Sequence, residues 1–338
     1  MNNGNAGNDN AESTLIPFDA GGRYGYLDRT GSFAIKPAYR LAFPFYEGLA
    51  LVACERKALL KKTVLSYGFI DPAGRMMIEP RFREAFSFTG GRAAVMPFRR
   101  GRPRWGFIDS AGMWAIKPEY DLVGGFFQER ARASRKDLWG YLAPDGKWAI
   151  EPVFDSAVDF SSDRAAVRPE AGKKWGYINR EGMMVIKPKF SWAEPFSDGM
   201  ARVRSGGKWG FIDRTGDYIF TPSFDYALNF SEGLAAVNVE RKFDDIMGSM
   251  RGGKWGYIDK KGHGVIDAHF DEACPFRNER ARVKLYGRWN FIDREGKLMD
   301  REGFDQASDF IGDSAPVWKE GRAFLFSHSG KLIPITVD

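Results

Sequence analysis

Short stretches in which apolar and polar residues alternate recur along the whole chain, in sets of three. The first stretch of a set has the form Gly-x-Ala-x-Val, as in residues 199–203, and the second has the form Trp-Gly-aromatic-Ile-Asp, as in 209–213. The third ends in Ile-x-Pro, as in 186–188. Alternation with a period of two is typical of a strand with one buried face. The pattern therefore predicts three short β-strands in each set.

The sets repeat with a basic step of 34 residues, which insertions lengthen to 36, 38, 43 or 46. The step is counted from the glycine after the Trp or Tyr, at Gly25, Gly68, Gly106, Gly140, Gly176, Gly210 and Gly256, and Asn290 takes this place in the eighth copy. A repeat of this size buries too few apolar side chains to fold alone, so the repeats must stack. A degenerate ninth copy follows at residues 323–330.

The second and third strands are joined by Asp-x-x-Gly in six copies, which begin at Asp28, Asp71, Asp109, Asp213, Asp259 and Asp293. An aspartate that accepts a hydrogen bond from the amide two residues on, followed by a glycine at positive φ, is hairpin-turn chemistry. Ala143 and Asn179 stand in the same column, so a carboxylate is not required there. The aspartates are therefore predicted to be structural rather than catalytic.

Two further features link the strands. The motif Phe-x-x-Ala-x-x-Phe after the third strand, as in 190–196, has a spacing of three and predicts a single helical or 3₁₀ turn between repeats. The glycine after each Trp has two explanations: close approach of a neighbouring backbone or ring, or positive φ in a bulge. Asn290 favours positive φ, because asparagine tolerates that region best after glycine.

Composition agrees with a folded β-rich chain, at 43% apolar with 28 Phe, 12 Tyr, 10 Trp and 39 Gly. The net charge of +6 is compatible with an acidic partner without requiring one. Cys54 and Cys274 stand at non-equivalent places in their repeats and are expected to be free thiols. Residues 1–13 predict a disordered tail with no signal peptide, and 14–338 a single repeat domain. We expect a cytoplasmic protein without a transmembrane segment.

The combined pattern resembles the WG-repeat (KWG-repeat) family of bacterial β-repeat proteins over roughly residues 14–338. The resemblance implies a β-repeat interaction module and carries over no catalytic residue and no cofactor. The repeat anchors, whose rings we expect to pack between repeats, are Tyr24, Tyr67, Trp105, Trp139, Trp175, Trp209, Trp255 and Trp289.

Two architectures suit about nine such repeats. The chain begins with a strand of the first type at residues 14–18 and ends with one of the third type at 331–335. This phasing leaves no strand over to close a ring, so it favours an open superhelical array of three-stranded β-meanders. A closed β-propeller is the alternative, and it requires a different phasing of strands within each repeat.

Function is best sought where the repeats differ. Two copies carry long, charged insertions between the first and second strands, at residues 55–66 and 240–253. Insertions at one point of a repeat often mark a binding face, although loop growth without a role is the competing explanation. The leading hypothesis is a non-catalytic protein-interaction scaffold whose partner contacts are Arg56, Lys57, Lys61, Lys62, Arg241, Lys242 and Arg251.

Two alternatives concern other ligands. Nucleic-acid binding would use two basic rows, one before the anchor aromatic (Arg23, Arg104, Lys174, Lys208, Lys254 and Arg288) and one in the next turn (Arg29, Arg180, Arg214, Lys260 and Arg294). Solvated cations that guard strand edges against aggregation are the competing explanation. Polysaccharide or cell-wall binding would need exposed aromatic pockets at the same place in each repeat.

Catalysis has little support in the sequence. The chain contains no Gly-x-Ser-x-Gly, no phosphate-binding loop, no His-Glu-x-x-His and no Cys-x-x-Cys. The seventh copy holds one unusual group, His263, Asp267, His269 and Cys274, whose spacing matches no known metal site. We therefore expect surface polar residues there, and a protein that is neither an enzyme nor a metal or cofactor binder. The sequence names neither the partner nor the oligomeric state.

Overall fold

The computed structural model describes residues 14–57, 63–244 and 249–336, with the side chains of 240–251 left out. None of these residues lies in a helix, so the all-β prediction is confirmed. The described part likewise has no helix long and apolar enough to cross a membrane. The chain divides into two compact units: an N-terminal unit of residues 14–160, with 169–171 and 336, and a C-terminal unit of residues 161–168 and 172–335.

The N-terminal unit contains strands β1 to β15. They are β1 (Ile16–Asp19), β2 (Tyr24–Leu27), β3 (Phe33–Tyr39), β4 (Leu41–Tyr46), β5 (Leu49–Lys57), β6 (Thr63–Ile70), β7 (Met76–Ala85), β8 (Ala93–Pro97), β9 (Trp105–Ile108), β10 (Trp114–Tyr120), β11 (Val123–Phe127), β12 (Arg130–Arg135), β13 (Leu138–Leu142), β14 (Trp148–Phe154) and β15 (Ser156–Ala157).

The C-terminal unit contains strands β16 to β33. They are β16 (Ala165–Arg168), β17 (Trp175–Ile178), β18 (Met184–Phe190), β19 (Trp192–Ser197), β20 (Met200–Ser205), β21 (Lys208–Ile212), β22 (Tyr218–Phe224), β23 (Tyr226–Ala227), β24 (Leu234–Asp244), β25 (Ser249–Asp259), β26 (Gly264–Phe270), β27 (Glu272–Ala273), β28 (Ala281–Leu285), β29 (Arg288–Ile292), β30 (Gln306–Ala307), β31 (Ser314–Lys319), β32 (Arg322–Ser327) and β33 (Leu332–Pro334).

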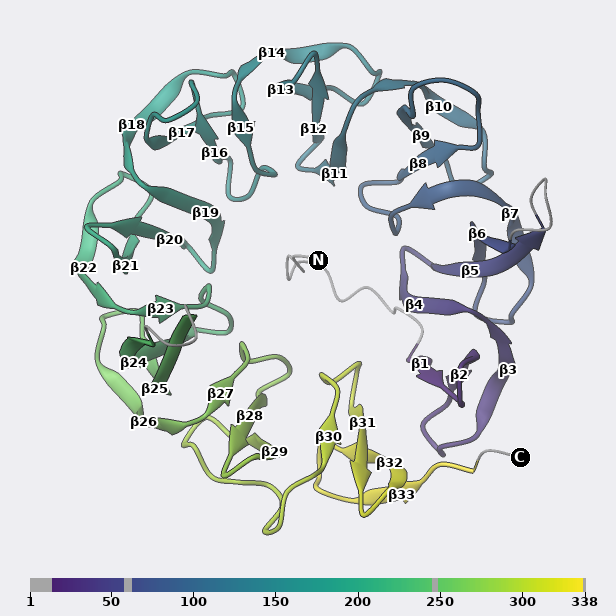
Figure 1. Ribbon diagram of the computed structural model, residues 1–338, viewed down its shortest axis with the longest axis vertical. Helices are drawn as coiled ribbons and strands as arrows, with labels where there is room; N and C mark the ends of the chain where they lie inside the picture. The colour runs from purple at the N-terminus through teal and green to yellow at the C-terminus, as the bar shows by residue number, and fades with distance from the viewer. Residues whose placement is uncertain (1–13, 58–62, 245–248, 337–338) are drawn as a thin grey trace. The chain divides into compact units, whose positions relative to one another are not determined.

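Both units are built from small sheets in which strands consecutive in the chain are neighbours (Figure 1). The N-terminal unit has a sheet of β1 to β3, a seven-stranded sheet of β4 to β10 and a four-stranded sheet of β11 to β14. In the C-terminal unit β16 to β18 pair in order, and the sheets β19–β22, β23–β26, β27–β29 and β30–β33 follow. The pairings within these sheets are antiparallel, as expected for a meander.

Most repeats have a fourth strand that the sequence analysis did not predict. The Phe-x-x-Ala-x-x-Phe segment forms a short strand, such as β19, in place of the predicted helical turn. Ala193 of β19 lies opposite Val203, and a β-bulge separates Ala193 from Phe196. The bulge adds one residue to the strand's period of two, so a spacing of three places both side chains in the core. The predicted three-stranded meander is thus corrected to a four-stranded one.

The core lies between successive sheets and is rich in aromatic rings. Tyr26, Tyr141, Tyr177 and Tyr257 are fully buried, and each hydroxyl donates to a backbone carbonyl 17 residues further on. Burial raises the pKa of each of these phenols. The hydroxyl therefore ties the Trp-Gly strand to the next strand but one, or to the residue directly after it, and satisfies a polar group in an apolar setting.

The anchor residues are buried to different degrees. Trp105, Trp175 and Trp209 are buried, at 4%, 4% and 8% exposed. The other anchors are half-buried, namely Tyr24, Tyr67, Trp139, Trp255 and Trp289. Arg202 lies over the Trp209 ring at 4.4 Å from its centre, and its guanidinium also donates to the Ala227 carbonyl of the next sheet. The anchor column thus packs against cations as well as apolar side chains.

The Asp-x-x-Gly turns have the predicted geometry. The Asp213 carboxylate accepts hydrogen bonds from the amides of Thr215 and Asp217, and Gly216 adopts a φ of +92°. The pKa of Asp213 is lowered, mainly because the Thr215 hydroxyl also donates to this carboxylate. These contacts are those of a turn, in agreement with the structural role that the sequence suggested.

The glycine after the anchor is explained by close approach of a neighbouring strand and not by positive φ. A Cβ on Gly256 would lie 2.5 Å from the Ile266 carbonyl oxygen, and Gly256 is not among the residues at positive φ. The third strand bulges here, since Trp255 pairs with Phe270 and Tyr257 with Ile266. The bulged backbone crosses directly over the glycine, so close approach is the reason for it. The prediction of positive φ was wrong.

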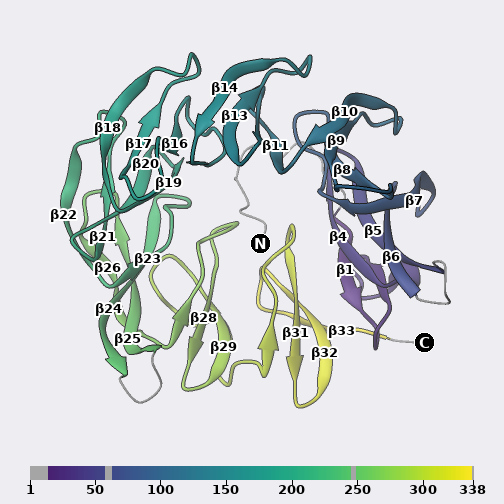
Figure 2. The ribbon, with the colours of Figure 1, turned by 45° about the horizontal axis from the view of Figure 1, so that its top comes forward.

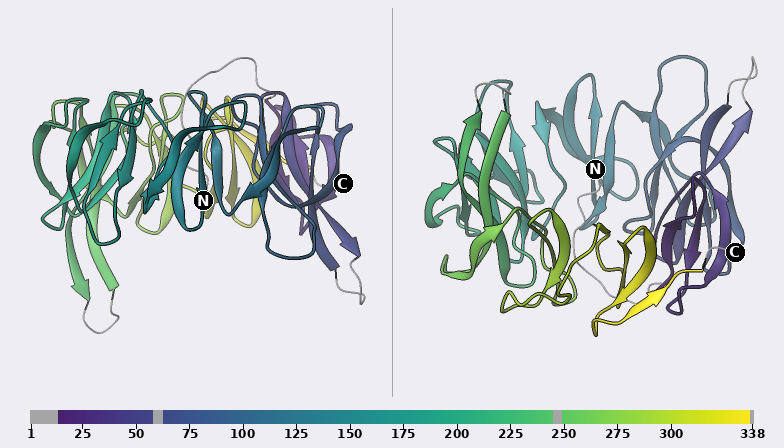
Figure 3. Two further views of the ribbon diagram at one scale, coloured as in Figure 1. Left: turned by 90° about the horizontal axis from the view of Figure 1, so that it is seen from above. Right: turned by 60° about the horizontal axis from the view of Figure 1, so that its bottom comes forward.

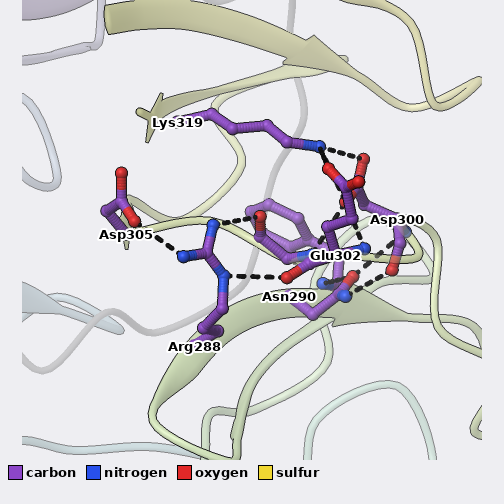
Figure 4. A network of polar contacts seen from close by, with 8 residues as sticks. Arg288, Asn290, Asp300, Glu302, Asp305 and Lys319 are labelled. Atoms are coloured by element: carbon purple, nitrogen blue, oxygen red, sulfur yellow. Dashed lines mark hydrogen bonds and ion pairs between the residues drawn. The ribbon is translucent and has the colours of Figure 1, made fainter. Parts of the chain in front are cut away.

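The eighth repeat shows why Asn290 misled the sequence analysis (Figure 4). Its buried side chain donates to the Asp300 carbonyl and accepts from the Asp300 amide at 3.2 Å and the Phe291 amide at 2.8 Å. The chain opposite forms only isolated bridges, from Trp289 to Phe304 and from Ile292 to Leu298. The asparagine amide therefore replaces part of the third strand's hydrogen bonding.

Candidate interaction surface

The first basic row is largely paired within its own repeats. Four of its members form an ion pair with the aspartate 17 residues further on: Arg104 with Asp121 at 2.6 Å, Lys208 with Asp225 at 2.5 Å, Lys254 with Asp271 at 2.6 Å and Arg288 with Asp305 at 2.9 Å. Arg23 pairs with Glu55 at 3.2 Å. In the fifth repeat Ser191 stands where the aspartate would be, 17 residues after Lys174. These cations are therefore engaged in the fold.

The second basic row joins neighbouring repeats of the C-terminal unit. Lys260 pairs with Asp198 at 2.9 Å, Arg214 with Asp163 at 3.6 Å, and Arg294 donates to the Glu232 carbonyl. Each acceptor lies in the turn that precedes the small-residue strand of the preceding repeat. Arg180 is 4.0 Å from Asp163. The row thus contributes to the stacking of repeats rather than to a continuous free cationic track.

The polar residues of the seventh repeat do not come together as a metal site. His263 lies 3.3 Å from Asp259, and His269 contacts the backbone carbonyl of Asp267. The Cys274 sulfur is 3.5 Å from the Arg282 guanidinium. No group of three His, Cys, Asp or Glu residues in the described ranges is placed to hold a metal ion.

The described residues of both insertions extend a strand pair. In the N-terminal unit β5 and β6 continue to pair from Cys54 opposite Ser66 to Lys57 opposite Thr63. In the C-terminal unit β24 and β25 pair as far as Asp244 opposite Ser249, and this green hairpin reaches beyond the neighbouring strands in Figure 3. Among the expected partner contacts, Lys61 and Lys62 lie outside the described residues, as do the side chains of Arg241, Lys242 and Arg251.

We call residues 54–57 and 63–66 the β5–β6 arm. Arg56 lies over the Phe98 ring at 5.0 Å from its centre, and Lys57 is exposed. Glu55 pairs with Arg40 as well as with Arg23, each at 3.2 Å. The arm is thus held on both faces at its base, by ion pairs and by a cation–π contact.

An open pocket of about 430 Å³ lies at the base of this arm. We call it the arm-base site, and it is lined by Leu65, Tyr67, Arg83, Glu84, Ala85, Phe86 and Trp105. Strands β4 to β7 lie side by side here (Figure 2), and β7 leaves β6 at Phe82 to pair with β8. The pocket therefore opens in the fork between two diverging strands.

The pocket lies at a position that an aromatic ring occupies in two other repeats. Glu84 lies directly before Ala85, at the position that Trp192 and Tyr226 hold before Ala193 and Ala227. In those repeats the ring covers the anchor, with centres 5.4 Å apart for Trp175 and Trp192 and 5.5 Å for Trp209 and Tyr226. The Glu84 carboxylate offers no such cover, so the space beside Tyr67 stays open. Burial raises the pKa of Tyr67, with a further contribution from Glu84.

The rim of the arm-base site combines exposed rings with cations. Phe86 is 40% exposed and stacks on Trp105 with ring centres 4.9 Å apart and planes at 4°. Arg83 of the lining, and Lys57 opposite Thr63 in the arm, form no ion pair with any residue that the structure describes. The site therefore combines the apolar side chains of Leu65, Phe86 and Trp105 with the cation of Arg83.

This arrangement suits binding better than chemistry. The site holds no paired acid and base and no nucleophile next to a base, and it is open to solvent. Sequence reasoning included Leu65 in the first insertion without naming it as a contact, named Trp105 only as an anchor, and missed Phe86. Glu84 gave no usable signal, because the same column holds Leu41, Leu122, Ser156, Glu272 and Gln306 as well as Trp192 and Tyr226.

The chain resembles solved structures along most of its length. A crystal structure of a eukaryotic initiation factor is 10% identical and superposes with a TM-score of 0.62, covering 94% of each chain. The β-propeller domain of the Trilobed protease from Pyrococcus furiosus is 12% identical, with a TM-score of 0.43, over 88% of this chain and 97% of that one. At such identities the likeness concerns the fold alone.

A search of curated proteins finds no match to this sequence. The family described as WG containing repeat matches seven segments, residues 24–57, 67–96, 105–139, 139–173, 175–209, 209–243 and 255–289. These segments begin at the anchor aromatics and together span more than half of the sequence. The chain therefore belongs to the WG-repeat family.

Proposed function

We propose that this protein is a non-catalytic interaction module that binds another protein through the arm-base site. The observation that carries the proposal is the open pocket beside the β5–β6 arm, lined by the exposed ring of Phe86 and by Arg83, which forms no ion pair with the described residues. Exposed apolar side chains with a polar rim are characteristic of protein-binding surfaces. Aromatic and arginine side chains supply most of the binding energy at such surfaces.

The other ligand classes have less support. Polysaccharide binding would need the same aromatic pocket in each repeat, but Trp192 and Tyr226 fill the equivalent space in theirs. Nucleic-acid binding along the basic rows would need free cations, whereas most members of the first row are paired with an aspartate. We place the interaction in the cytoplasm, where the free thiols of Cys54 and Cys274 would stay reduced.

The test is affinity capture with two matched double variants of the full chain. The first, Arg83→Glu with Phe86→Ala, changes the arm-base site. The second, Lys117→Glu with Val153→Ala, changes an exposed cation and an exposed apolar side chain of the same unit away from the arm. Each captured protein is then purified and its affinity measured by calorimetry, and the melting temperature of each variant confirms that it is folded.

We expect the first variant to weaken binding of the purified partner at least about tenfold, which corresponds to about 1.4 kcal/mol. The second variant should bind as the unchanged chain does. Equal affinity of all three proteins for the same partners would refute the proposed function.

A further inference from the structure

The β5–β6 arm leaves part of one strand edge without a partner. The Arg40 amide donates to the Ala53 carbonyl at 2.8 Å, so Ala53 directs its backbone groups toward β4. Backbone groups alternate in direction along a strand, so those of Cys54 and Arg56 point toward β6. Their partners Ser66 and Val64 point back toward β5.

It follows that Thr63 and Leu65 direct their amide and carbonyl groups away from β5. The backbone amide and carbonyl of Tyr67 also point away from β5, and Tyr67 pairs with Phe82 of β7. Because β7 then turns to β8, pairing with β6 begins only at Tyr67. Within the described chain, nothing pairs with the outer edge of β6 at Thr63 and Leu65.

The same short segment also lines the pocket. The Leu65 side chain lies in its wall together with Tyr67, while Arg83 and Glu84 of β7 form the other side. A strand laid along Thr63 and Leu65 would therefore place side chains of one face into the pocket. A volume of about 430 Å³ accommodates one large apolar side chain of such a strand.

Charge further restricts the ligand. Arg83 lines the pocket and Lys57 lies opposite Thr63 in the arm, both without an ion pair in the described part of the chain, and Glu84 is the one acidic side chain of the lining. Glu55 is already paired with Arg23 and Arg40. Carboxylates beside the apolar anchor would thus meet cations.

We propose that the arm-base site binds an extended acidic peptide by β-strand addition to Thr63 and Leu65, with one large apolar side chain in the pocket. This proposal rests on the proposed function and specifies its mode of recognition. In strand addition the backbone hydrogen bonds supply affinity and the pocket supplies specificity. An unprotected strand edge is suited to such pairing.

The experiment uses a short fluorescein-labelled peptide of alternating valine and glutamate with one central phenylalanine, and the full chain. Binding is measured by fluorescence anisotropy. Two N-methylated forms of the peptide are compared, one methylated at alternate residues and the other at the residues between them. Only one of these sets can face β6 in a strand, because amide direction alternates.

We expect one N-methylated peptide to bind at least about tenfold more weakly and the other to stay within about twofold of the unmodified peptide. Replacing the central phenylalanine with alanine should also weaken binding at least about tenfold. Leu65→Pro removes the outward amide at an edge position that tolerates proline, and it should weaken binding more than Leu65→Ala does. Melting temperatures of both variants confirm folding.

Equal binding of the two N-methylated peptides would overturn strand addition. So would a labelled single-stranded RNA that binds more tightly than the peptide and is lost in Arg83→Glu, since that result would assign the site to nucleic acid. If the peptide fails while a purified partner still depends on Arg83 and Phe86, strand addition is refuted and the proposed function stands. If neither ligand depends on these residues, both proposals fail.

Discussion

The seventh and eighth repeats have the same length between anchor and closing aromatic, yet their third strands follow different paths. In the seventh repeat β26 pairs with β25 from Gly264 to Phe270 and crosses over Gly256. In the eighth, the residues that would form this strand pair only in isolated bridges around Asn290. The eighth repeat therefore has the Asn290 side chain where the seventh has Gly256, and it lacks the third strand that crosses this position in the seventh.

The eighth repeat compensates with side-chain contacts. The Asp300 carboxylate accepts from the amides of Glu302 and Gly303 and pairs with Lys319 at 3.3 Å (Figure 4). The pKa of Lys319 is raised, first by its hydrogen bond to Glu302 and then by Asp300. Side chains can therefore replace a backbone ladder when the backbone is excluded, provided that each polar group finds a partner.

Removal of an anchor ring should have the largest effect and should separate regular repeats from the eighth. Trp209→Ala truncates a buried ring that packs against Arg202 and Tyr226, and we expect a loss of about 3–5 kcal/mol in unfolding free energy. Trp289→Ala should cost less, because that ring is half-buried. Chemical denaturation measures both. An unchanged stability of Trp209→Ala would show that the ring is not part of the core.

Substitution of Gly256, over which the third strand crosses, should cause the next largest loss of stability. Gly256→Ala places a Cβ against the Ile266 carbonyl, and we expect a loss of about 1–3 kcal/mol. Gly264→Ala in the same sheet is the matched control, since a Cβ there meets no atom within 4 Å. Thermal denaturation compares the two. If Gly256→Asn were tolerated while Gly256→Ala was not, the sequence-based explanation by positive φ would be restored.

Loss of the Asn290 side-chain amide is predicted to lower stability less than substitution of Gly256 does. Asn290→Ala leaves the Asp300 and Phe291 amides without their side-chain acceptor, and we expect a loss of about 1–2 kcal/mol. Hydrogen exchange should speed up first at these two amides. Unchanged exchange at both would mean that the asparagine does not replace the missing strand.

The smallest predicted effect is a pH dependence in the seventh repeat. The Lys254 ammonium lowers the pKa of Asp271 by donating to its carboxylate, and the Gly287 amide adds to this. A carboxylate with a depressed folded pKa stabilises the protein above its unfolded pKa of about 3.9, and this is lost as pH falls through the folded pKa. Asp271→Asn should therefore lower the melting temperature at neutral pH, with the difference disappearing in acid. A difference that persists at low pH would assign the effect to packing.

Much of the architecture could be predicted from local signals. The alternation around Gly-x-Ala-x-Val predicted the strands, and Asp-x-x-Gly predicted the turns, because both depend on residues close together in the chain. The fourth strand was missed because the bulge between Ala193 and Phe196 turns a strand into a spacing of three, which resembles a helical turn. The arm-base site was missed in part because Tyr67 and Trp105 are anchors of the repeat pattern and look like ordinary repeat residues.

By itself, the sequence determined the family, the all-β repeat and the positions of the turns, since these follow from a pattern that recurs every few tens of residues. The tertiary structure decided which backbone crosses each glycine, which cations are already paired, and where a ring is missing. These depend on residues brought together from different strands and repeats, such as Lys208 with Asp225 or Glu84 beside Tyr67. Periodicity along one chain does not specify such contacts, because bulges and strand divergence change which side chains meet.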